Sequence, residues 1–414
     1  MHGAAAIESN SVNPPRALLM GVIAFLSFNL SMGCMFGPFG VLIAPIEQRL
    51  DVSREISTLA VPIVTFGISL LAPFVGSLTS RISLRLMMLA GSLLMAAGFA
   101  VLALANSVVL FIGAYALLIS PGLCVCGVVA PTTLVTRWFH INCGRALGLA
   151  TTPALMAATP LLVTFVLKNF GLGAAYGLLA GLMLVCAVAS FFAVDRPART
   201  HANAEKGDPR GDENEATSER SPPKVFRDSR FWRLALAGGL YNAVIVMFST
   251  QLVPFALGEG IDPTRAALLL TAYLVGTLIG TPLFGWFADK VGGARMIGLL
   301  CVLLALWQGL LLTQPSYAFL ALLAGLAGLQ GAAMISCLGL ALSERFGQNS
   351  FATAYGMANL VGLPFAVLSV PIASGLFVRT GSYSPAFLLA ATVLMIGAVL
   401  AFSIGRRSAI PTRA

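Results

Sequence analysis

Charge is scarce in this sequence. Only 10% of its 414 residues are Asp, Glu, Lys or Arg, whereas 58% are hydrophobic. Soluble domains carry about 25% charged residues, so the composition excludes an ordinary water-soluble protein and indicates a chain that mostly contacts lipid. The net charge of +9 does not indicate nucleic-acid binding, because the basic residues lie in short segments between long apolar runs rather than on one folded face. We expect no nucleic-acid partner.

Cysteine and histidine are also few. All of the seven cysteines except Cys143 lie in apolar runs, so no disulfide framework is expected. The three histidines lie outside those runs, and no His, Cys and carboxylate spacing suits a metal. The sequence has neither a Gly-rich phosphate loop nor a nucleophile constellation of the kind a membrane enzyme needs. We therefore expect no catalytic residue, no metal and no cofactor.

Long charge-free gaps dominate what is present. A membrane helix needs about 20 predominantly apolar residues, because its backbone must be satisfied within the helix. The third gap in each half has twice that length and splits at a turn signal, Asn106-Ser107 in one and Gln314-Pro315-Ser316 in the other. With those splits the sequence predicts twelve spans. The gaps are 17–46, 56–80, 86–136, 146–167, 169–194, 234–258, 266–288, 296–343, 346–378 and 380–405.

The two halves of the chain repeat one another. Asn106 and Gln314 lie 208 residues apart, and the same offset separates Gly148 from Gly356. Several matches at one offset indicate duplication. The predicted fold is an all-α polytopic membrane protein of two six-helix pseudo-repeats. We expect a bundle over residues 1–194, a polar linker over 195–230 and a second bundle over 231–414.

The basic residues are distributed unequally between the two ends of the predicted spans. With the N-terminus inside, 20 of the 25 Lys and Arg residues fall in inner segments. The outer loops keep Arg49, Arg54, Lys168, Arg265 and Arg379. Since inner loops of membrane proteins are enriched in Lys and Arg, both termini are predicted to be cytoplasmic.

The loop between the eighth and ninth predicted spans reads Gly285-Trp286-Phe287-Ala288-Asp289-Lys290-Val291-Gly292-Gly293-Ala294-Arg295. Gly285 permits close helix approach, and Asp289 can accept hydrogen bonds from a helix N-terminus or pair with a cation. This segment closely resembles the loop signature of the major facilitator superfamily (MFS). The resemblance implies twelve transmembrane helices and an acidic-basic latch that holds the cytoplasmic ends together and is released during transport.

The matching loop of the first half departs from that pattern, because Ser80 replaces the acidic residue and Ser83 a glycine. We expect the latch to be weaker or differently made there, so that Asp289→Asn impairs transport far more than Ser80→Ala. The residues assigned to the latch are Gly76, Arg81, Arg85, Arg137, Arg145, Gly285, Asp289, Lys290, Arg295, Glu344 and Arg345.

Within the superfamily, the first half resembles the bacterial oxalate/formate and monocarboxylate carrier branch. The residues that carry the resemblance are Phe36-Gly37-Pro38-Phe39-Gly40-Val41, Ser53-Arg54-Glu55-Ile56-Ser57 and Arg137-Trp138-Phe139 with Gly144-Arg145-Ala146-Leu147-Gly148-Leu149-Ala150. The branch's usual Gly-Trp-Arg after the fifth span is missing, since the chain has Gly171-Leu172-Gly173. The resemblance implies a functional monomer in a bacterial inner membrane.

No Asp, Glu, Lys, Arg or His lies at mid-depth in the predicted spans. A charge there usually marks ion or proton work, so its absence argues against coupling through a buried carboxylate. The solute would be held by hydroxyls, amides and half-helix N-termini. In the superfamily the first, fourth, seventh and tenth helices line the cavity, beside the second, fifth, eighth and eleventh. The polar candidates on these spans are Asn29, Tyr241, Asn242, Tyr273, Gln330, Tyr355 and Asn359, and for each a helix–helix hydrogen bond is the competing interpretation.

These features predict transport of a small organic solute by alternating access, with a monocarboxylate or related organic acid as the favoured class. The alternative within the fold is efflux of hydrophobic or neutral compounds. Drug/proton antiporters usually carry a GPxxGG motif in the fifth span, but this chain has Thr159-Pro160-Leu161-Leu162 without flanking glycines. A channel or receptor is a further class, against which the twofold repeat and the loop signature argue.

Overall fold

A computed structural model describes residues 14–139, 142–195, 226–313 and 316–404, and these residues form helices joined by short turns, without a strand. In the first half the elements are α1 (Pro14–Phe36), α2 (Phe39–Leu50), α3 (Arg54–Thr58), α4 (Ala60–Leu78), α5 (Leu84–Leu104), α6 (Val108–Ala114), η1 (Tyr115–Ile119), α7 (Ser120–Leu123), η2 (Cys124–Val129), α8 (Ala130–Trp138), α9 (Cys143–Ala150) and α10 (Ala154–Phe191). In the second half they are α13 (Ser229–Gly258), α14 (Pro263–Val291), α15 (Gly293–Leu311), α16 (Tyr317–Gln330), α17 (Ala333–Phe346), α18 (Gln348–Thr380) and α19 (Ser384–Phe402).

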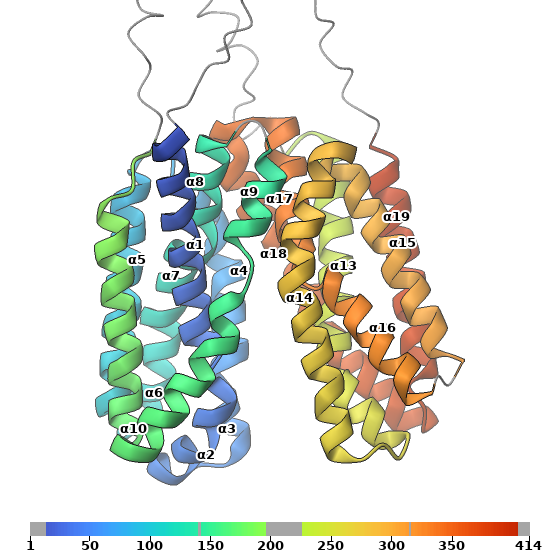
Figure 1. Cartoon of the computed structure of the whole chain (residues 1–414), viewed down its shortest axis with the longest axis horizontal. Helices are drawn as coiled ribbons and strands as arrows, with labels where there is room; N and C mark the ends of the chain where they lie inside the picture. The colour runs from blue at the N-terminus through green and yellow to red at the C-terminus, as the bar shows by residue number, and fades with distance from the viewer. Residues whose placement is uncertain (1–13, 140–141, 196–225, 314–315, 405–414) are drawn as a thin grey trace, which may run out of the picture.

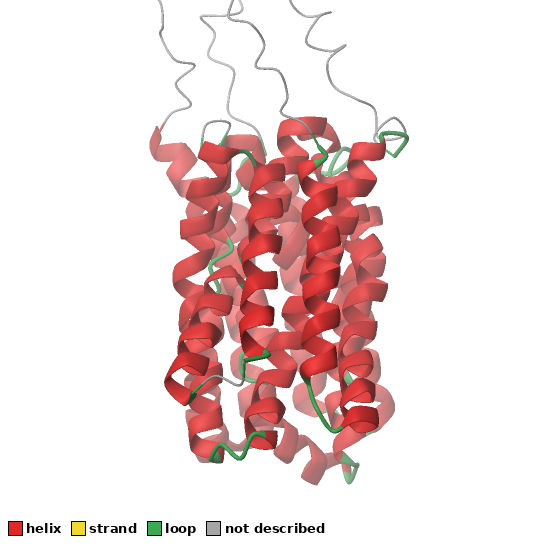
Figure 2. Ribbon diagram, turned by 90° about the vertical axis from the view of Figure 1, so that its right-hand side faces the viewer, coloured by secondary structure: helices red, strands yellow, loops and turns green. Residues whose placement is uncertain are grey.

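The helices run side by side in two groups, α1–α10 and α13–α19 (Figure 1). The start of α1, the end of α10, the start of α13 and the end of α19 all lie at one end of the molecule, which we call the terminal end (Figures 1 and 2). The opposite end is called the distal end. Most of the predicted linker, residues 196–225, lies outside the described residues.

Eleven helical stretches in the described residues are long and apolar enough to cross a membrane, and one of them accounts for two spans. That stretch, Cys143–Phe191, has 49 residues. A straight helix of that length would measure about 70 Å, more than twice the hydrocarbon core of about 30 Å. The chain reverses at Gly171, whose φ of 82° and ψ of 179° are not helical and suit glycine. The structure is therefore consistent with the twelve predicted spans.

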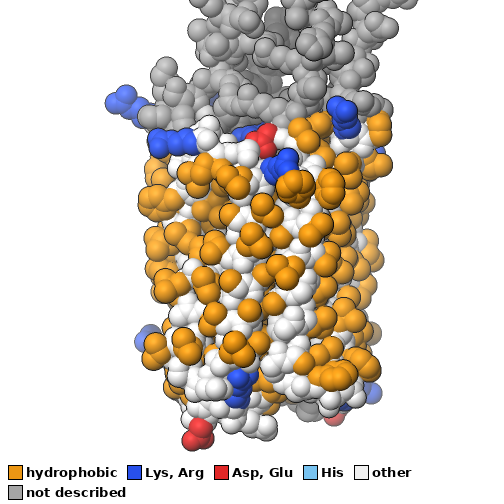
Figure 3. All heavy atoms as spheres, turned by 90° about the vertical axis from the view of Figure 1, so that its left-hand side faces the viewer, with side chains coloured by type: hydrophobic (Ala, Val, Ile, Leu, Met, Phe, Trp, Pro, Cys, Tyr) orange, Lys and Arg blue, Asp and Glu red, His pale blue; other side chains and the backbone are white. Residues whose placement is uncertain are grey.

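The outer surface is apolar over most of its height. Figure 3 shows hydrophobic side chains covering the middle of one face, with Lys, Arg, Asp and Glu near the two ends. Large aliphatic residues are exposed throughout, among them Leu104, Leu117, Leu161, Val188 and Val378. Such a surface is stable only in contact with lipid, so the chain is a multi-pass membrane protein.

Small residues set the helix contacts inside the bundles. On α14, Gly276 and Gly280 lie against the backbone of α16, and Gly328 of α16 lies against the backbone of Tyr273. A Cβ at any of these glycines would overlap a backbone atom of the neighbouring helix. Within lipid, close backbone approach of this kind replaces the hydrophobic effect as the source of helix association.

Three spans are irregular, which charge-free length alone does not predict. The fifth is interrupted between α9 and α10 at Thr151–Pro153, where Pro153 cannot donate to the helix ladder. The tenth is interrupted between α16 and α17 at Gly331 and Ala332. The fourth contains two π-helical segments, η1 and η2. Irregular backbone inside a membrane needs hydrogen-bond partners, so we expect polar side chains beside these interruptions.

Candidate functional site: an inter-bundle latch and a polar interior

Asp289 joins the two bundles at the terminal end. Its Oδ1 accepts a hydrogen bond from the backbone N–H of Gly144 at 2.6 Å, and its Oδ2 accepts one from Arg145 at 2.7 Å. Both amides belong to the first turn of α9, whose N-cap residue Asn142 makes no side-chain cap. The carboxylate of α14 therefore caps a helix of the other half, and its charge is favourable there because a helix N-terminus carries partial positive charge.

Glycines bring the bundles into backbone contact beside Asp289. A Cβ on Gly148 would lie 2.7 Å from the Thr281 carbonyl, and Gly285 lies directly against the Gly144 carbonyl. A second contact lies between α4 and α18, where Gly76 packs on Ala352 and Gly356 packs on Ala72. The terminal end is thus closed by two helix pairs, α9 with α14 and α4 with α18.

The contact between α4 and α18 contains no carboxylate like Asp289. The position at which α18 begins explains this difference. By the offset of 208, Ala352 and Thr353 correspond to Gly144 and Arg145. Helix α18 begins at Gln348, so these two amides lie beyond its first turn and already have intrahelical partners. An acid at position 80 would find no free N–H there. Ser80 instead donates to the Ser77 carbonyl at 2.8 Å and is exposed.

Asp195, just after the end of α10, caps α5 within the first bundle. It accepts from the backbone N–H groups of Leu84 at 3.0 Å and Arg85 at 3.3 Å, and it lies 3.9 Å from the Arg137 guanidinium. Arg137 also donates to the Thr79 carbonyl at 2.9 Å. The sequence analysis placed Asp195 in the linker and missed its role as a cap. Its position directly after the charge-free gap 169–194 could have indicated that it lies at the end of a span.

The remaining predicted latch residues surround these contacts. Glu344 caps the start of α15 by accepting from the Gly293 N–H at 3.2 Å, and Arg345 follows it in the last turn of α17. Lys290 lies 3.5 Å above the Trp286 ring and Arg85 lies 3.8 Å above the Phe191 ring. Exposed basic side chains complete the terminal end, namely Arg81, Arg145 and Arg295. Their parts in the latch remain predictions.

Asn29 lies at the interruption of the fifth span. Its side-chain oxygen accepts from the Leu155 N–H at 3.1 Å, and its nitrogen donates to the Phe25 carbonyl at 3.1 Å. Asn29 therefore caps the N-terminus of α10 from α1. One turn below, Thr159 of α10 donates to the Gly33 carbonyl of α1 at 2.8 Å. These contacts fix a half-helix N-terminus inside the membrane.

Tyr241, Tyr273 and Gln330 meet at the interruption of the tenth span. The Tyr241 hydroxyl donates to the Gln330 carbonyl at 2.8 Å, and the Tyr273 hydroxyl lies beside Gly331. The Gln330 amide fits with its nitrogen donating to the Leu300 carbonyl at 2.9 Å and its oxygen accepting from Trp307 Nε1 at 2.6 Å. All three side chains are buried, and the hydrogen bonds of Tyr241 and Gln330 stabilise the broken helix.

The last three predicted site residues lie on α13 and α18. Tyr355 stacks on Phe351 with ring centroids 5.5 Å apart, and its carbonyl accepts from the Asn359 amide at 2.9 Å. Asn242 of α13 is exposed, whereas Asn359 is half-buried. Of the seven predicted residues, the structure brings Tyr241, Tyr273 and Gln330 together and pairs Tyr355 with Asn359. Whether any of the seven contacts solute remains a prediction.

The arrangement is that of a two-bundle protein held shut at one end by polar and van der Waals contacts. Sequence comparison agrees with it. The profile of the Major Facilitator Superfamily matches residues 18–260 and 252–413, which together cover most of the chain. The chain belongs to the Major Facilitator Superfamily. It is accordingly a membrane transporter of small solutes.

Relatives place this superfamily member near the monocarboxylate transporters. It is 24% identical over 383 residues to monocarboxylate transporter 13 of Rattus norvegicus, covering 90% of this chain and 85% of that protein. It is 30% identical over 161 residues to monocarboxylate transporter 12 of Homo sapiens, covering 36% of this chain and 30% of that protein.

Solved structures share the fold. The fucose:proton symporter FucP of E. coli superposes with a TM-score of 0.73 at 15% identity, covering 96% of this chain and all of that one. The human organic anion transporter MFSD10 superposes with a TM-score of 0.71 at 16% identity, covering 94% of this chain and all of that one. At these identities the likeness shows the fold alone.

Proposed function

We propose that this MFS transporter carries a monocarboxylate or a related small organic acid by alternating access. The observation that carries the proposal is the similarity to monocarboxylate transporter 13, which extends over 90% of the chain rather than over one motif. The carrier would lie in a bacterial inner membrane with both termini in the cytoplasm, as its Lys and Arg distribution predicts. It would act as a monomer, because each chain contains both bundles.

With that orientation, the terminal end is the cytoplasmic end. The contacts of α9 with α14 and of α4 with α18 would then close the protein to the cytoplasm, and this conformation would be one that opens outward. Release of Asp289 from the amides of Gly144 and Arg145 would accompany the change to the inward state. Because both states must be populated during turnover, the latch has to be weak enough to break in each cycle.

A carboxylate bound between the bundles would meet few cations. The spans carry no charged side chain at mid-depth, so we assign anion recognition to hydroxyls, amides and the N-terminus of α10. Asn29 fixes that N-terminus. We assign the amides of Asn242 and Asn359 to the same task from the other bundle. Exchange or facilitated diffusion follows more readily from such a site than proton symport through a buried carboxylate.

Counterflow tests the proposal. Purified protein in liposomes preloaded with an unlabelled monocarboxylate such as lactate should take up the radiolabelled acid in a saturable manner, whereas liposomes without protein should not. Saturable counterflow separates a carrier from a channel. If only hydrophobic or neutral compounds exchange, the monocarboxylate assignment is wrong and the efflux alternative replaces it.

A further inference from the structure

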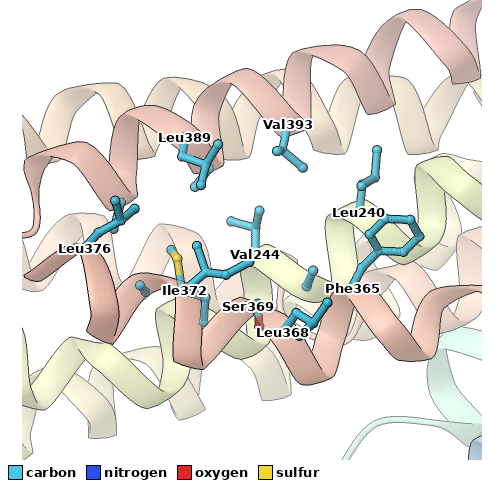
Figure 4. A pocket seen from close by; sticks show the side chains of 14 residues that line it. Leu240, Val244, Phe365, Leu368, Ser369, Ile372, Leu376, Leu389 and Val393 are labelled. Carbon is cyan, nitrogen blue, oxygen red and sulfur yellow. The ribbon is translucent and has the colours of Figure 1, made fainter.

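An apolar cavity lies within the second bundle. It has a volume of about 150 Å³ and is formed by α13, α18 and α19 (Figure 4). Its walls are aliphatic and aromatic apart from one hydroxyl. Most of the lining comes from α18 and α19, and includes Leu368, Ile372, Leu376, Leu389 and Val393. The hydroxyl of Ser369 donates to the Ala366 carbonyl at 2.8 Å, so the cavity offers a ligand no free donor.

Helix contacts bound the cavity toward the terminal end. Gly239 of α13 lies against Gly362 of α18, where an added Cβ would approach Gly362 Cα to 2.7 Å. Gly397 of α19 lies close to Ala237 of α13. Beyond these contacts α18 contains Pro364 and Pro371, which permit bending. The three helices are thus held together near the terminal end and separate farther along.

An aromatic cluster bounds the cavity toward the distal end. Tyr383 stacks on Phe377 with ring centroids 4.5 Å apart, and Phe255 meets Phe387 edge-on at 5.1 Å. The Tyr383 hydroxyl donates to the Gln251 side chain at 3.2 Å. Aromatic side chains with a polar partner are typical of the membrane–water interface. This cluster separates the cavity from water at the distal end.

The remaining opening faces sideways, between α18 and α19. Three lining residues at this opening are strongly exposed: Leu368 at 54%, Ile372 at 46% and Leu389 at 43%. In a membrane-spanning bundle these side chains face hydrocarbon. Ala386 to Val393 are within about 15 Å of the distal start of α19, so the opening lies in the leaflet at the distal end.

We propose that this cavity binds one acyl chain of a membrane phospholipid. An apolar cavity of about 150 Å³ holds a benzene-sized molecule in other proteins, which corresponds to a segment of about six chain carbons. The apolar lining has no free hydrogen-bond donor for a polar solute. The lateral opening faces the lipid hydrocarbon rather than water. An acyl chain recovers the dispersion contacts that an empty cavity would lack. This proposal does not depend on which solute is carried.

Photolabelling tests this site on the full-length protein. It is reconstituted in phosphatidylcholine vesicles that contain a small fraction of phosphatidylcholine with a diazirine in the middle of one acyl chain. After irradiation, labelled peptides are quantified by mass spectrometry. We expect labelling to concentrate on residues 365–376 and 386–393. Labelling spread evenly over exposed apolar helices, for example around Val188 in the first bundle, would overturn the proposal.

Two neighbouring substitutions provide a matched comparison. Leu389→Trp fills the opening, whereas Leu388→Trp adds the same side chain on an exposed surface outside the lining. We expect Leu389→Trp to reduce labelling of the site several-fold and Leu388→Trp to leave it unchanged. Ser369→Leu fills the cavity from its floor and should also reduce labelling. Equal labelling in the wild type, Leu389→Trp and Ser369→Leu, each eluting as a monodisperse protein, would refute the site.

Discussion

One carboxylate of this transporter connects its two bundles. Asp289 caps α9 across the bundle interface, while the corresponding position 80 is a serine bonded within its own turn. The difference follows from where the facing helix begins: α9 starts at Cys143 and leaves the amides of Gly144 and Arg145 free, whereas α18 starts four residues before Ala352. The first bundle keeps an acid for its own α5 in Asp195.

We predict that Asp289→Asn lowers the initial rate of counterflow several-fold, whereas Ser80→Ala leaves it near the wild-type rate. The neutral amide loses the interaction of a charge with the helix N-terminus, which contributes up to about 2 kcal/mol in partly buried sites. A loss of 1–2 kcal/mol shifts a two-state equilibrium about 5- to 30-fold toward the state open at the terminal end. Equal and negligible effects of the two substitutions would contradict the assigned role of Asp289.

A native thiol reports the same shift independently of transport. Cys143 is buried beneath the latch at the first residue of α9, next to Gly144. Asp289→Asn should therefore accelerate alkylation of Cys143 by N-ethylmaleimide, measured by mass spectrometry. Cys186 of α10 is also buried, within the first bundle beside the Ser92 hydroxyl, so its alkylation rate should stay the same and serves as the control.

Asn29 illustrates a structural role that is compatible with a role in binding. We predict that Asn29→Ala lowers the stability of the protein in detergent by about 1 kcal/mol, because the N-terminus of α10 loses its cap. Asn169→Ala is the matched control, since Asn169 also donates to a carbonyl of its own helix but is exposed and caps no other helix. A thermal unfolding experiment compares the two. Equal transition temperatures for both variants would show that the cap contributes nothing.

The contact of α4 with α18 belongs to the scale of whole helices. Gly356 and Gly76 let these helices touch backbone to backbone, and no side chain larger than hydrogen fits at either position. Close packing of this kind is either present or lost, because the interiors of proteins have little free volume. If the two bundles separate during transport, as we propose, we expect this helix pair to be either fully packed or fully parted.

We predict that Gly356→Ala impairs counterflow strongly, because a methyl group would meet the Ala72 carbonyl and keep the terminal end from closing. Gly375→Ala on the same helix has nothing within 4 Å of its added Cβ. That variant gains the higher helix propensity of alanine, up to about 1 kcal/mol, without a clash. Initial rates of both variants in liposomes provide the measurement. Wild-type transport by Gly356→Ala would show that closure does not need this contact.

At the scale of the whole molecule, the orientation in the membrane decides which side the closed end faces. The described termini of both bundles lie at one end, and the basic residues of the sequence predict that this end faces the cytoplasm. The same structure in the opposite orientation would be closed to the outside. The direction in which the described conformation opens therefore depends on topology as much as on packing.

Topology is tested by adding one exposed cysteine at each end. Ser382→Cys lies at the distal end and Ser229→Cys at the terminal end, and both positions are exposed. We predict that a membrane-impermeant maleimide labels Ser382→Cys in intact cells and labels Ser229→Cys only after permeabilisation. All seven native cysteines are buried, so background labelling should be low. The reverse pattern would invert the assigned orientation.

The sequence by itself determined the membrane class and the twelve spans, and it identified Asp289 as a candidate. Charge-free length marks a span because hydrocarbon excludes charge, and Asp289 was identifiable because its loop lies between two such spans. These are local properties of the chain, and a chain that must satisfy its backbone in lipid has few alternatives to a helix. The match to the superfamily over both halves agrees with that reading.

Only the tertiary structure decided which polar groups partner which. Sequence could not show that Asn29 caps α10, that Tyr241 donates to the Gln330 carbonyl, or that Asp195 caps α5. Each of these contacts joins residues from different spans, and their geometry depends on helix register and on where a helix is interrupted. Helix register and the position of an interruption depend on how closely the backbones pack at glycines. The charge and the hydrophobic length of a span carry no information about that packing.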